Sequence, residues 1–330
     1  MATPALLQSL RLPVIASPML IASYPDMVLA QCKSGIVGSF PALNARSSTQ
    51  LDDWLGMIDA DLQAHRAALP ESILGPYALN HICHPSNTRL EADLRIAIDR
   101  RVPVMITSLR APAREVVDEV HRYGGILLHD VTTIRHAEKA LEAGVDGLIL
   151  VAAGAGGHAG TLSPFALVPE VRRFYSGFVA LAGSIATGDA IAAACALGAD
   201  CAYIGTRFIA SREANVVSGY KDTIVQATAA DIVYTDAFTG VHGNYLRQSI
   251  EAAGIDLRTL TRVEGARMDF SPESGAKQWR DIWGAGQGVG SMDTVLSVAE
   301  IVERLDAEYR AAIARLEPLG RSTPHTVMPH

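Results

Sequence analysis

The chain has 330 residues, of which 49% are hydrophobic, 19% charged and only 6% aromatic, and it contains 28 glycines. This amount of apolar material excludes a disordered or collagen-like chain and suffices for two average domains or one large α/β barrel. The net charge of −7, without a basic block, argues against a groove for nucleic acid. The most apolar stretch, residues 147–157, is too short to span a membrane, which takes roughly 20 residues, so we expect no membrane partner.

The four cysteines, Cys32, Cys83, Cys195 and Cys201, are scattered along the chain and form no CxxC pair. We therefore expect reduced, buried thiols. The N-terminal residues show no basic segment ahead of a long apolar core, so we expect no signal peptide and a cytoplasmic location. Abundant Ala, Gly, Val, Ile and Leu with few aromatic residues is typical of parallel strands covered by helices.

Eight short apolar runs follow one another over the first two thirds of the chain. Their hydrophobicity is continuous rather than alternating, which indicates strands buried on both faces. They are Leu12–Met19, Gly35–Phe40, Tyr77–Ile82, Val102–Leu109, Gly125–Val131, Gly147–Ala152, Phe178–Gly183 and Cys201–Thr206. Amphipathic segments lie between them, and those at 135–143 and 189–197 are each followed by a Gly-x-Asp motif that leads into the next run. This pattern predicts a (β/α)8 TIM barrel, with a doubly wound open sheet as the alternative.

The regular spacing stops after the eighth run. Residues 217–290 contain polar turns at 234–243, helical stretches at 245–253 and 279–283, and no strand of comparable quality. We interpret them as a mainly helical second domain on the substrate side, inserted after strand 8 of a barrel domain formed by residues 1–216. A period of 3.6 residues returns over 294–316 and predicts a last helix that packs on the barrel. Residues 291–330 would thus be this helix and a flexible tail.

Two glycine-containing loops follow the seventh and eighth runs. Gly183 and Ser184 end one run, and Gly205 and Thr206 end the next. Each loop has unshielded backbone amides and a hydroxyl group, and a helix begins after it. These features predict a phosphate site at the carboxyl ends of these strands. The alternative is that these glycines only permit tight turns.

A histidine among small residues follows the sixth run. His158 lies within Gly154–Gly160, where no neighbour could fill a core. Small neighbours would let a planar ligand approach, and we expect a general base with a pKa near the working pH; the alternative is a surface-loop histidine. Residues 154–159 also fit GxGxxG/A, but no helix follows, which disfavours a dinucleotide-binding fingerprint.

Polar side chains at other strand ends predict a ligand pocket at the same rim of the barrel. They are Ser17, Pro18 and Met19 in the first run, Asn80 and His81 in the third, Thr107 and Ser108 in the fourth, and His129 and Asp130 in the fifth. Taken singly, such residues are more often satisfied core groups. The loop 284–290, which contains Gln287, is expected to return from the insertion and to touch the ligand. No metal site is expected, because His81 and His84 have no second pair at ligand spacing.

These motifs resemble the FMN-dependent nitronate monooxygenases, formerly called 2-nitropropane dioxygenases. The resemblance rests on residues 156–160, 182–185, 197–200 and 204–208, and more loosely on residues 13–19 and 283–287. It extends over nearly the whole chain. It also includes related NADH:quinone reductases and FMN-dependent enoyl-acyl-carrier-protein reductases.

The resemblance implies a barrel with FMN at its mouth. The phosphate would lie on Gly183, Ser184, Gly205 and Thr206, and Met19 and Asn80 would lie along the flavin ring. His158 would be the active-site base or a group that orients the substrate. In the family, a nitronate gives an electron to FMN, and O2 completes its cleavage to a carbonyl compound and nitrite.

The sequence departs from the family pattern at three places. Pro18 stands where many members have a glycine, Asp130 where some relatives carry a lysine near the flavin, and Ala152, Ala153 and Ala155 where relatives often place an acidic residue. FMN binding is still expected, while the substrate stays open. An NAD(P)H-dependent FMN reductase is one alternative function, and a non-catalytic ligand-binding barrel is another. A monomer and a homodimer are equally compatible with the sequence.

Overall fold

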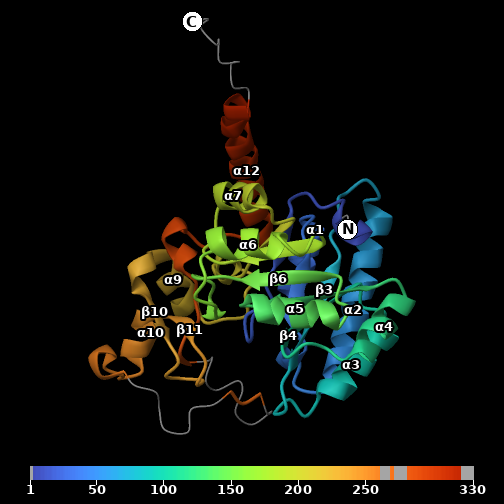
Figure 1. Ribbon diagram of the computed structural model, residues 1–330, viewed down its shortest axis with the longest axis horizontal. Helices are drawn as coiled ribbons and strands as arrows, with labels where there is room; N and C mark the ends of the chain where they lie inside the picture. The colour runs from blue at the N-terminus through green and yellow to red at the C-terminus, as the bar shows by residue number, and fades with distance from the viewer. Residues whose placement is uncertain (1–2, 261–267, 271–280, 321–330) are drawn as a thin grey trace, which may run out of the picture.

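Eight parallel strands form the centre of the computed structural model, which describes residues 3–260, 268–270 and 281–320 (Figure 1). In sheet order they are β1, β9, β8, β6, β5, β4, β3 and β2. A parallel bridge between Ile15 and Val37 joins β1 to β2 and closes the ring. The strands are β1 (Val14–Ala16), β2 (Gly38–Pro41), β3 (Tyr77–Cys83), β4 (Val104–Leu109), β5 (Ile126–Val131), β6 (Gly147–Val151), β8 (Phe178–Ala182) and β9 (Cys201–Ile204). The predicted TIM barrel is confirmed. Each of the eight apolar runs overlaps one of its strands, and only β2 and β3 extend past their runs, by one residue each.

Helices cover the outside of this barrel. They are α1 (Pro25–Lys33), α2 (Ser48–Ala68), α3 (Leu90–Asp99), α4 (Arg114–Arg122), α5 (Ile134–Glu142), α6 (Pro164–Arg172), α7 (Gly188–Leu197), α8 (Thr206–Ile209) and α12 (Val298–Gly320). The last of these confirms the predicted C-terminal helix: its first turns pack Val298, Ile301 and Leu305 against Val14 of β1 and Ile191 of α7. Its far end projects beyond the rest of the molecule (Figure 1). The predicted tail after residue 320 lies outside the described residues.

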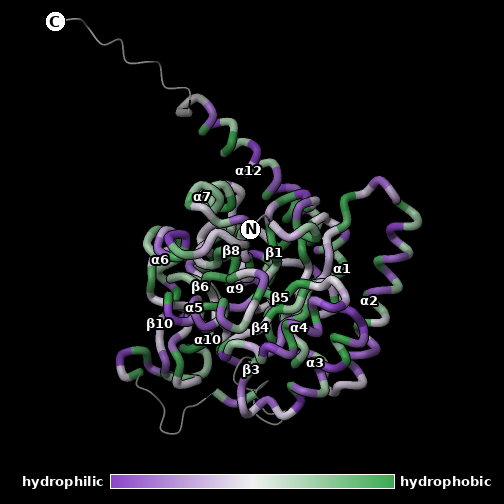
Figure 2. The backbone as a smooth tube through the Cα atoms, turned by 45° about the vertical axis from the view of Figure 1, so that its right-hand side comes forward, coloured by the Kyte–Doolittle hydropathy of each residue, from purple (hydrophilic) through white to green (hydrophobic). Residues whose placement is uncertain are grey.

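Burial on both faces explains why the strand runs are continuously apolar. Inside the barrel, alternate residues such as Val104, Ile106 and Ile149 form one cluster. Their neighbours along the strands, such as Met105 and Leu148, pack outward against the helices. The green, hydrophobic colouring of the strands in Figure 2 follows from these two contacts.

The repeated Gly-x-Asp motif anchors the amino ends of two strands. Asp146, before β6, accepts a hydrogen bond from the backbone N–H of Leu127 in β5 at 2.7 Å. Asp200, before β9, accepts the same bond from Val179 in β8 at 2.8 Å. Each carboxylate also meets a basic side chain, His121 in the first case and Arg172 in the second. The aspartate of this motif therefore holds neighbouring strands in register.

A small antiparallel sheet lies beside the barrel mouth. It joins β10 (Ile232–Thr235), β11 (Gly243–Leu246) and β7 (Gly157–His158), in that order. The sequence analysis expected only turns and helices in residues 232–246, so this hairpin is a correction within the predicted insertion. Both strands have only four residues, and β10 is half exposed whereas β11 is buried, so neither gives a long alternating pattern.

Helices complete this region as expected, in the form of α9 (Ser218–Gln226) and α10 (Arg247–Ala252). Short 3-10 turns are η1 (Ala5–Leu7), η2 (Ala42–Asn44), η3 (Ala229–Asp231), η4 (Leu257–Thr259) and η5 (Gln287–Ser291). Of the helix predicted at 279–283, residues 279 and 280 fall outside the described residues, and among residues 281–283 only Asp281 is helical.

Candidate functional site

A cavity of about 660 Å³ opens at the carboxyl ends of the barrel strands. Its walls come from the loops after β1, β6, β8 and β9, from the small sheet, and from the loop that precedes η5. This is the end of the barrel at which parallel (β/α)8 proteins bind ligands, and the volume suits a cofactor-sized molecule. The described lining contains no lysine or arginine and a single carboxylate, Asp130.

Strained backbone gathers around this cavity. Ile21, Leu109 and Ser184 have φ values of 60°, 76° and 56° and all three line the cavity. A left-handed conformation costs a non-glycine residue of order 1–2 kcal/mol, so it persists only where surrounding contacts impose it. The clustering marks this rim as the part of the fold shaped for a ligand.

Asn44 imposes the strained turn after β1. Its side chain accepts the N–H of Ile21 at 2.8 Å and donates to the carbonyl oxygens of Met19 and Ser23 at 3.0 and 2.7 Å. The next residue, Ala45, accepts a hydrogen bond from Arg89.

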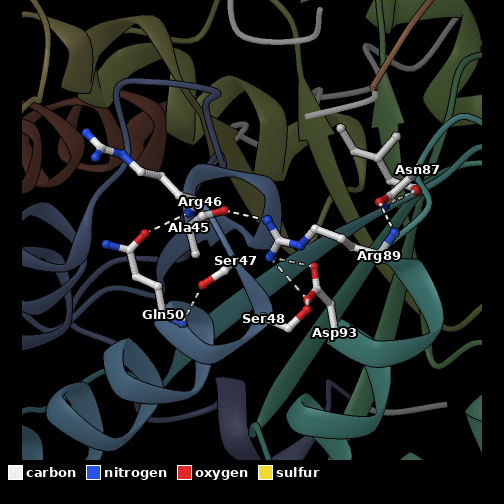
Figure 3. A network of polar contacts seen from close by, with 9 residues as sticks. Ala45, Arg46, Ser47, Ser48, Gln50, Asn87, Arg89 and Asp93 are labelled. Atoms are coloured by element: carbon white, nitrogen blue, oxygen red, sulfur yellow. Dashed lines mark hydrogen bonds and ion pairs between the residues drawn. The ribbon is translucent and has the colours of Figure 1, made fainter. Parts of the chain in front are cut away.

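A polar network holds the segment that carries Asn44. Arg89 pairs with Asp93, which also accepts a bond from Ser48 at the start of α2 (Figure 3). Asn87, from the same loop, donates to the carbonyl oxygen of Ile82 at the end of β3. The loops after β2 and β3 are thereby locked together, and they fix the position of Met19.

The wall opposite β3 is made of closely packed glycines. A Cβ atom on Gly156 would come within 2.8 Å of the backbone nitrogen of Gly286, and one on Gly286 within 2.6 Å of the oxygen of Gly154. Gly154 also accepts the N–H of Gln287 at 2.9 Å. The late glycine loop therefore packs on the loop after β6, and both expose backbone to the cavity.

The loops after β8 and β9 meet this wall. Gly183 has a φ of +128°, and a Cβ atom there would lie 2.7 Å from the carbonyl oxygen of Ala153. Thr206 Oγ1 accepts the N–H of Gly286 at 2.9 Å. The first turn of α7 points its donors elsewhere, because Gly188 N–H bonds to Glu308 and Ala190 N–H to the hydroxyl of Thr187. An anion bound at the loops after β8 and β9 would therefore meet loop hydroxyl and amide groups rather than the amino terminus of α7.

His158 lies on β7, at the inner edge of the small sheet. Its register partner is Gly243 of β11, and its Nε2 is 2.9 Å from Thr239 Oγ1. The Thr239 hydroxyl also donates to the carbonyl oxygen of Val241 at 3.0 Å. Burial lowers the pKa of His158 to about 4, so the imidazole is neutral at pH 7. The expected pKa near the working pH is therefore wrong, because the hairpin encloses this histidine.

A chain of polar side chains forms the floor of the cavity. Asn80 Nδ2 donates to Ser108 Oγ at 2.7 Å, and Ser108 Oγ donates to Asp130 Oδ2 at 2.7 Å. Burial raises the pKa of Asp130 to about 7. Tyr203 of β9 lines the same floor, and burial together with the Asp130 charge raises its pKa well above 10.

Most of the predicted site residues line this one cavity. They are Ser17, Pro18, Met19, Asn80, His158, Gly183, Ser184, Gly205 and Thr206. Gln287 lies behind the glycine wall and contributes its backbone N–H to Gly154 instead.

His129 does not line the cavity, contrary to the expectation. It is 2% exposed and its Nδ1 is 2.8 Å from Thr107 Oγ1. Side chains alternate along a strand, so His129 shares the outward side of β5 with Leu127 and Val131. Its neighbour Asp130 takes the inward position.

Three contributors were not singled out from the sequence: Asn44, Tyr203 and Thr239. Asn44 ends the 3-10 turn η2 and Thr239 lies in a loop, and their partners are more than 20 and 80 residues away along the chain. Tyr203 could have been found, because inward positions of β9 alternate and the last of them must face the rim.

The chain is similar to known proteins over nearly its whole length. The family model described as nitronate monooxygenase matches residues 6–308. A nitronate monooxygenase from Paraburkholderia phytofirmans is 25% identical over 92% of this chain and 94% of its own length. Among the 725 solved chains that match, FabK from Thermotoga maritima has a TM-score of 0.77 at 25% identity, covering 97% of this chain and 99% of that one. A nitroalkane oxidase from Streptomyces ansochromogenes has a TM-score of 0.74 at 25% identity, covering 95% and 100%. The chain is an oxidoreductase that belongs to the nitronate monooxygenase family.

Proposed function

We propose that this protein binds FMN in the cavity and oxidises alkyl nitronates with O2 to a carbonyl compound and nitrite. Family membership supports the reaction class. The observation that carries the proposal is the meeting of His158 with the Gly183–Ser184 and Gly205–Thr206 loops around one cavity. A phosphate-bearing planar cofactor and a small substrate would both be accommodated there.

The residues present suit FMN. The glycine wall leaves no room for side chains between residues 154–156 and 284–286, so a flat ring can lie against bare backbone. A Cβ atom on Gly205 would sit 3.3 Å from the Cβ of Ser17 and 3.4 Å from Met19 Sδ, which would crowd the same space. Since Thr206 Oγ1 already accepts the Gly286 N–H, its own hydrogen is directed to another acceptor, such as a phosphate oxygen.

The chain's own residues would bind and orient the substrate. FMN, when bound, would supply the electron chemistry. A nitronate is already deprotonated at carbon, so it needs no general base. Because the Thr239 hydroxyl donates to Val241, the ring hydrogen of neutral His158 lies on Nε2 and is given to Thr239, which holds the ring in place. A nitronate anion beside the ring would favour the imidazolium, whose Nδ1–H can then donate to a nitronate oxygen. The small sheet closes over His158 and limits access of water to it.

The test begins with colour. The purified protein should be yellow, with flavin absorbance near about 450 nm. Mixed anaerobically with propyl nitronate, its flavin should bleach quickly, and in air nitrite should accumulate. Fast bleaching by NADH would reject nitronate oxidation as the main activity. A colourless protein that takes up no FMN would reject flavin function altogether.

An NAD(P)H-dependent FMN reductase is the second candidate. The likeness to FabK over 97% of this chain favours it, at an identity equal to that of the nitroalkane oxidase. The same anaerobic mixing distinguishes the two, since NADH would then be the fast reductant. Membership of an enzyme family disfavours the third alternative, a non-catalytic barrel.

A further inference from the structure

Asp130 occupies an unusual position for a carboxyl group. It is the one acid in the described lining of the cavity, and none of the described lining residues is a lysine or arginine. Its Oδ2 accepts the hydroxyl of Ser108, whereas its Oδ1 is buried without a partner among the described residues. A buried carboxylate with no cation is costly, but a buried carboxylic acid is much less so.

Tyr203 adds a second polar atom to the same floor. Tyr203 is 7% exposed, and its hydroxyl, which lies near the Ser17 side chain, makes no hydrogen bond of regular geometry to the described residues. A negative charge on Asp130 would act on Tyr203, as the raised pKa of the phenol indicates. Two polar atoms beside one cavity that lack regular hydrogen bonds to the described residues point to a ligand that supplies the missing bonds.

We propose that Asp130 recognises the flavin ring as a neutral acid, with the proton on Oδ1 donated to an acceptor atom of the ring. The location of the proton follows from the geometry, because Ser108 donates to Oδ2 and leaves Oδ1 to carry the hydrogen. The Tyr203 hydroxyl is the second donor on this floor. This inference rests on the proposed flavin function and adds a pH dependence to it.

Other ionisable groups near Asp130 could also make flavin binding depend on pH. Ser108 from β4, Asn80 from β3 and Ser17 just after β1 carry no charge, and Tyr203 from β9 stays protonated. The other titratable side chains in the described lining are Tyr220, which burial keeps protonated, and His136, His158 and His242. His129, the chain neighbour, faces outward to Thr107. A variant at residue 130 alone keeps all of these histidines, so their effects cancel in the comparison.

The sign of the pH effect follows from linkage. If only the protonated acid donates to the ring, flavin affinity is full below the pKa of Asp130 and falls as pH rises through it. The raised pKa of about 7 places this change at neutral pH. Above the midpoint, the affinity should drop by up to about tenfold per pH unit.

The experiment measures flavin affinity of the flavin-stripped full chain by fluorescence quenching at pH 6 and pH 8.5. Riboflavin is the main probe because it lacks the phosphate, which itself titrates near pH 6. The wild type should bind riboflavin roughly tenfold more weakly at pH 8.5. Asp130→Asn keeps a donor at every pH, so its affinity should change by less than about threefold. FMN should show the same difference between the two proteins.

A second variant keeps the test decisive if the first folds poorly. The Ser108 hydroxyl stabilises the ionised form of Asp130 and so lowers its pKa. Ser108→Ala should therefore move the midpoint of flavin binding to higher pH, whereas a purely structural role would leave the midpoint in place.

Equal pH dependence in the wild type and Asp130→Asn would overturn the assignment while leaving flavin binding intact. No uptake of either flavin at any pH would overturn it together with the proposed function. The two failures are thus distinguishable.

Discussion

The two ends of the barrel place carboxyl groups in opposite surroundings. At the amino end, Asp146 and Asp200 each accept a backbone N–H and meet a basic side chain. At the carboxyl end, Asp130 has one hydroxyl partner and a buried oxygen with no described partner. The first arrangement stabilises strand register, and the second leaves bonding capacity for a ligand.

Backbone strain follows a similar division. Of the four described non-glycine residues with positive φ, Ile21, Leu109 and Ser184 lie at the cavity, and Arg101 lies just before β4. Unsatisfied atoms and strained turns both cost stability, so the rim must be held by contacts such as those of Asn44 and Arg89. Substitutions at the two ends should therefore have different, and partly opposite, effects.

The largest effect is expected at the amino end, from Asp200→Ala. The change leaves the buried N–H of Val179 and the guanidinium of Arg172 without their carboxylate. We expect a loss of about 3 kcal/mol in the free energy of unfolding, measured by urea denaturation. Flavin affinity of the folded protein should stay within about twofold.

Asp118→Ala is the matched control for this loss. Asp118 also pairs with an arginine, but the two side chains are 51% and 64% exposed. Exposed pairs contribute little, so the cost should stay below about 0.5 kcal/mol. Equal losses in the free energy of unfolding for Asp200→Ala and Asp118→Ala would contradict a special role of the Gly-x-Asp motif.

The next effect concerns activity at the carboxyl end, from His158→Asn. Removing the imidazole should lower kcat/KM for nitronate by about 100-fold, slightly under 3 kcal/mol in the barrier. Stability and flavin content should change little, because the histidine touches the small sheet rather than the barrel core. Unchanged turnover of every substrate tried would remove His158 from the mechanism.

A gain in stability is expected from Asp130→Asn. A folded-state pKa raised to about 7 contributes stability that is present at acid pH and is lost as pH rises through 7. The flavin-free wild type should therefore weaken relative to the variant by about 2 kcal/mol between pH 5 and pH 8. Urea denaturation at the two pH values measures this difference. If Asp130→Asn were less stable than the wild type at both pH values, Asp130 would instead stabilise the fold, as Asp146 and Asp200 do at the amino end.

The sequence predicted the features that depend on local pattern. Continuous apolar runs such as Gly147–Val151 are long enough to identify a strand, and glycines mark the rim loops that follow. The pattern did not separate His129 from Asp130, because adjacent residues of a doubly buried strand are both buried and only the register shows which one faces inward. His158 was found from its small neighbours, but its neutral state depends on a hairpin more than 80 residues away.

The smallest effect tests that hairpin, through Thr239→Val. The substitution keeps the volume but removes the hydroxyl that is 2.9 Å from His158 Nε2. One such hydrogen bond amounts to about 1 kcal/mol, so kcat/KM should fall by roughly fivefold to tenfold with flavin content unchanged. Thr239→Ser should restore the rate. In the His158→Asn background the same change should have no further effect, because Thr239 acts through the imidazole. An equal loss in both backgrounds would show that Thr239 supports the sheet rather than the histidine.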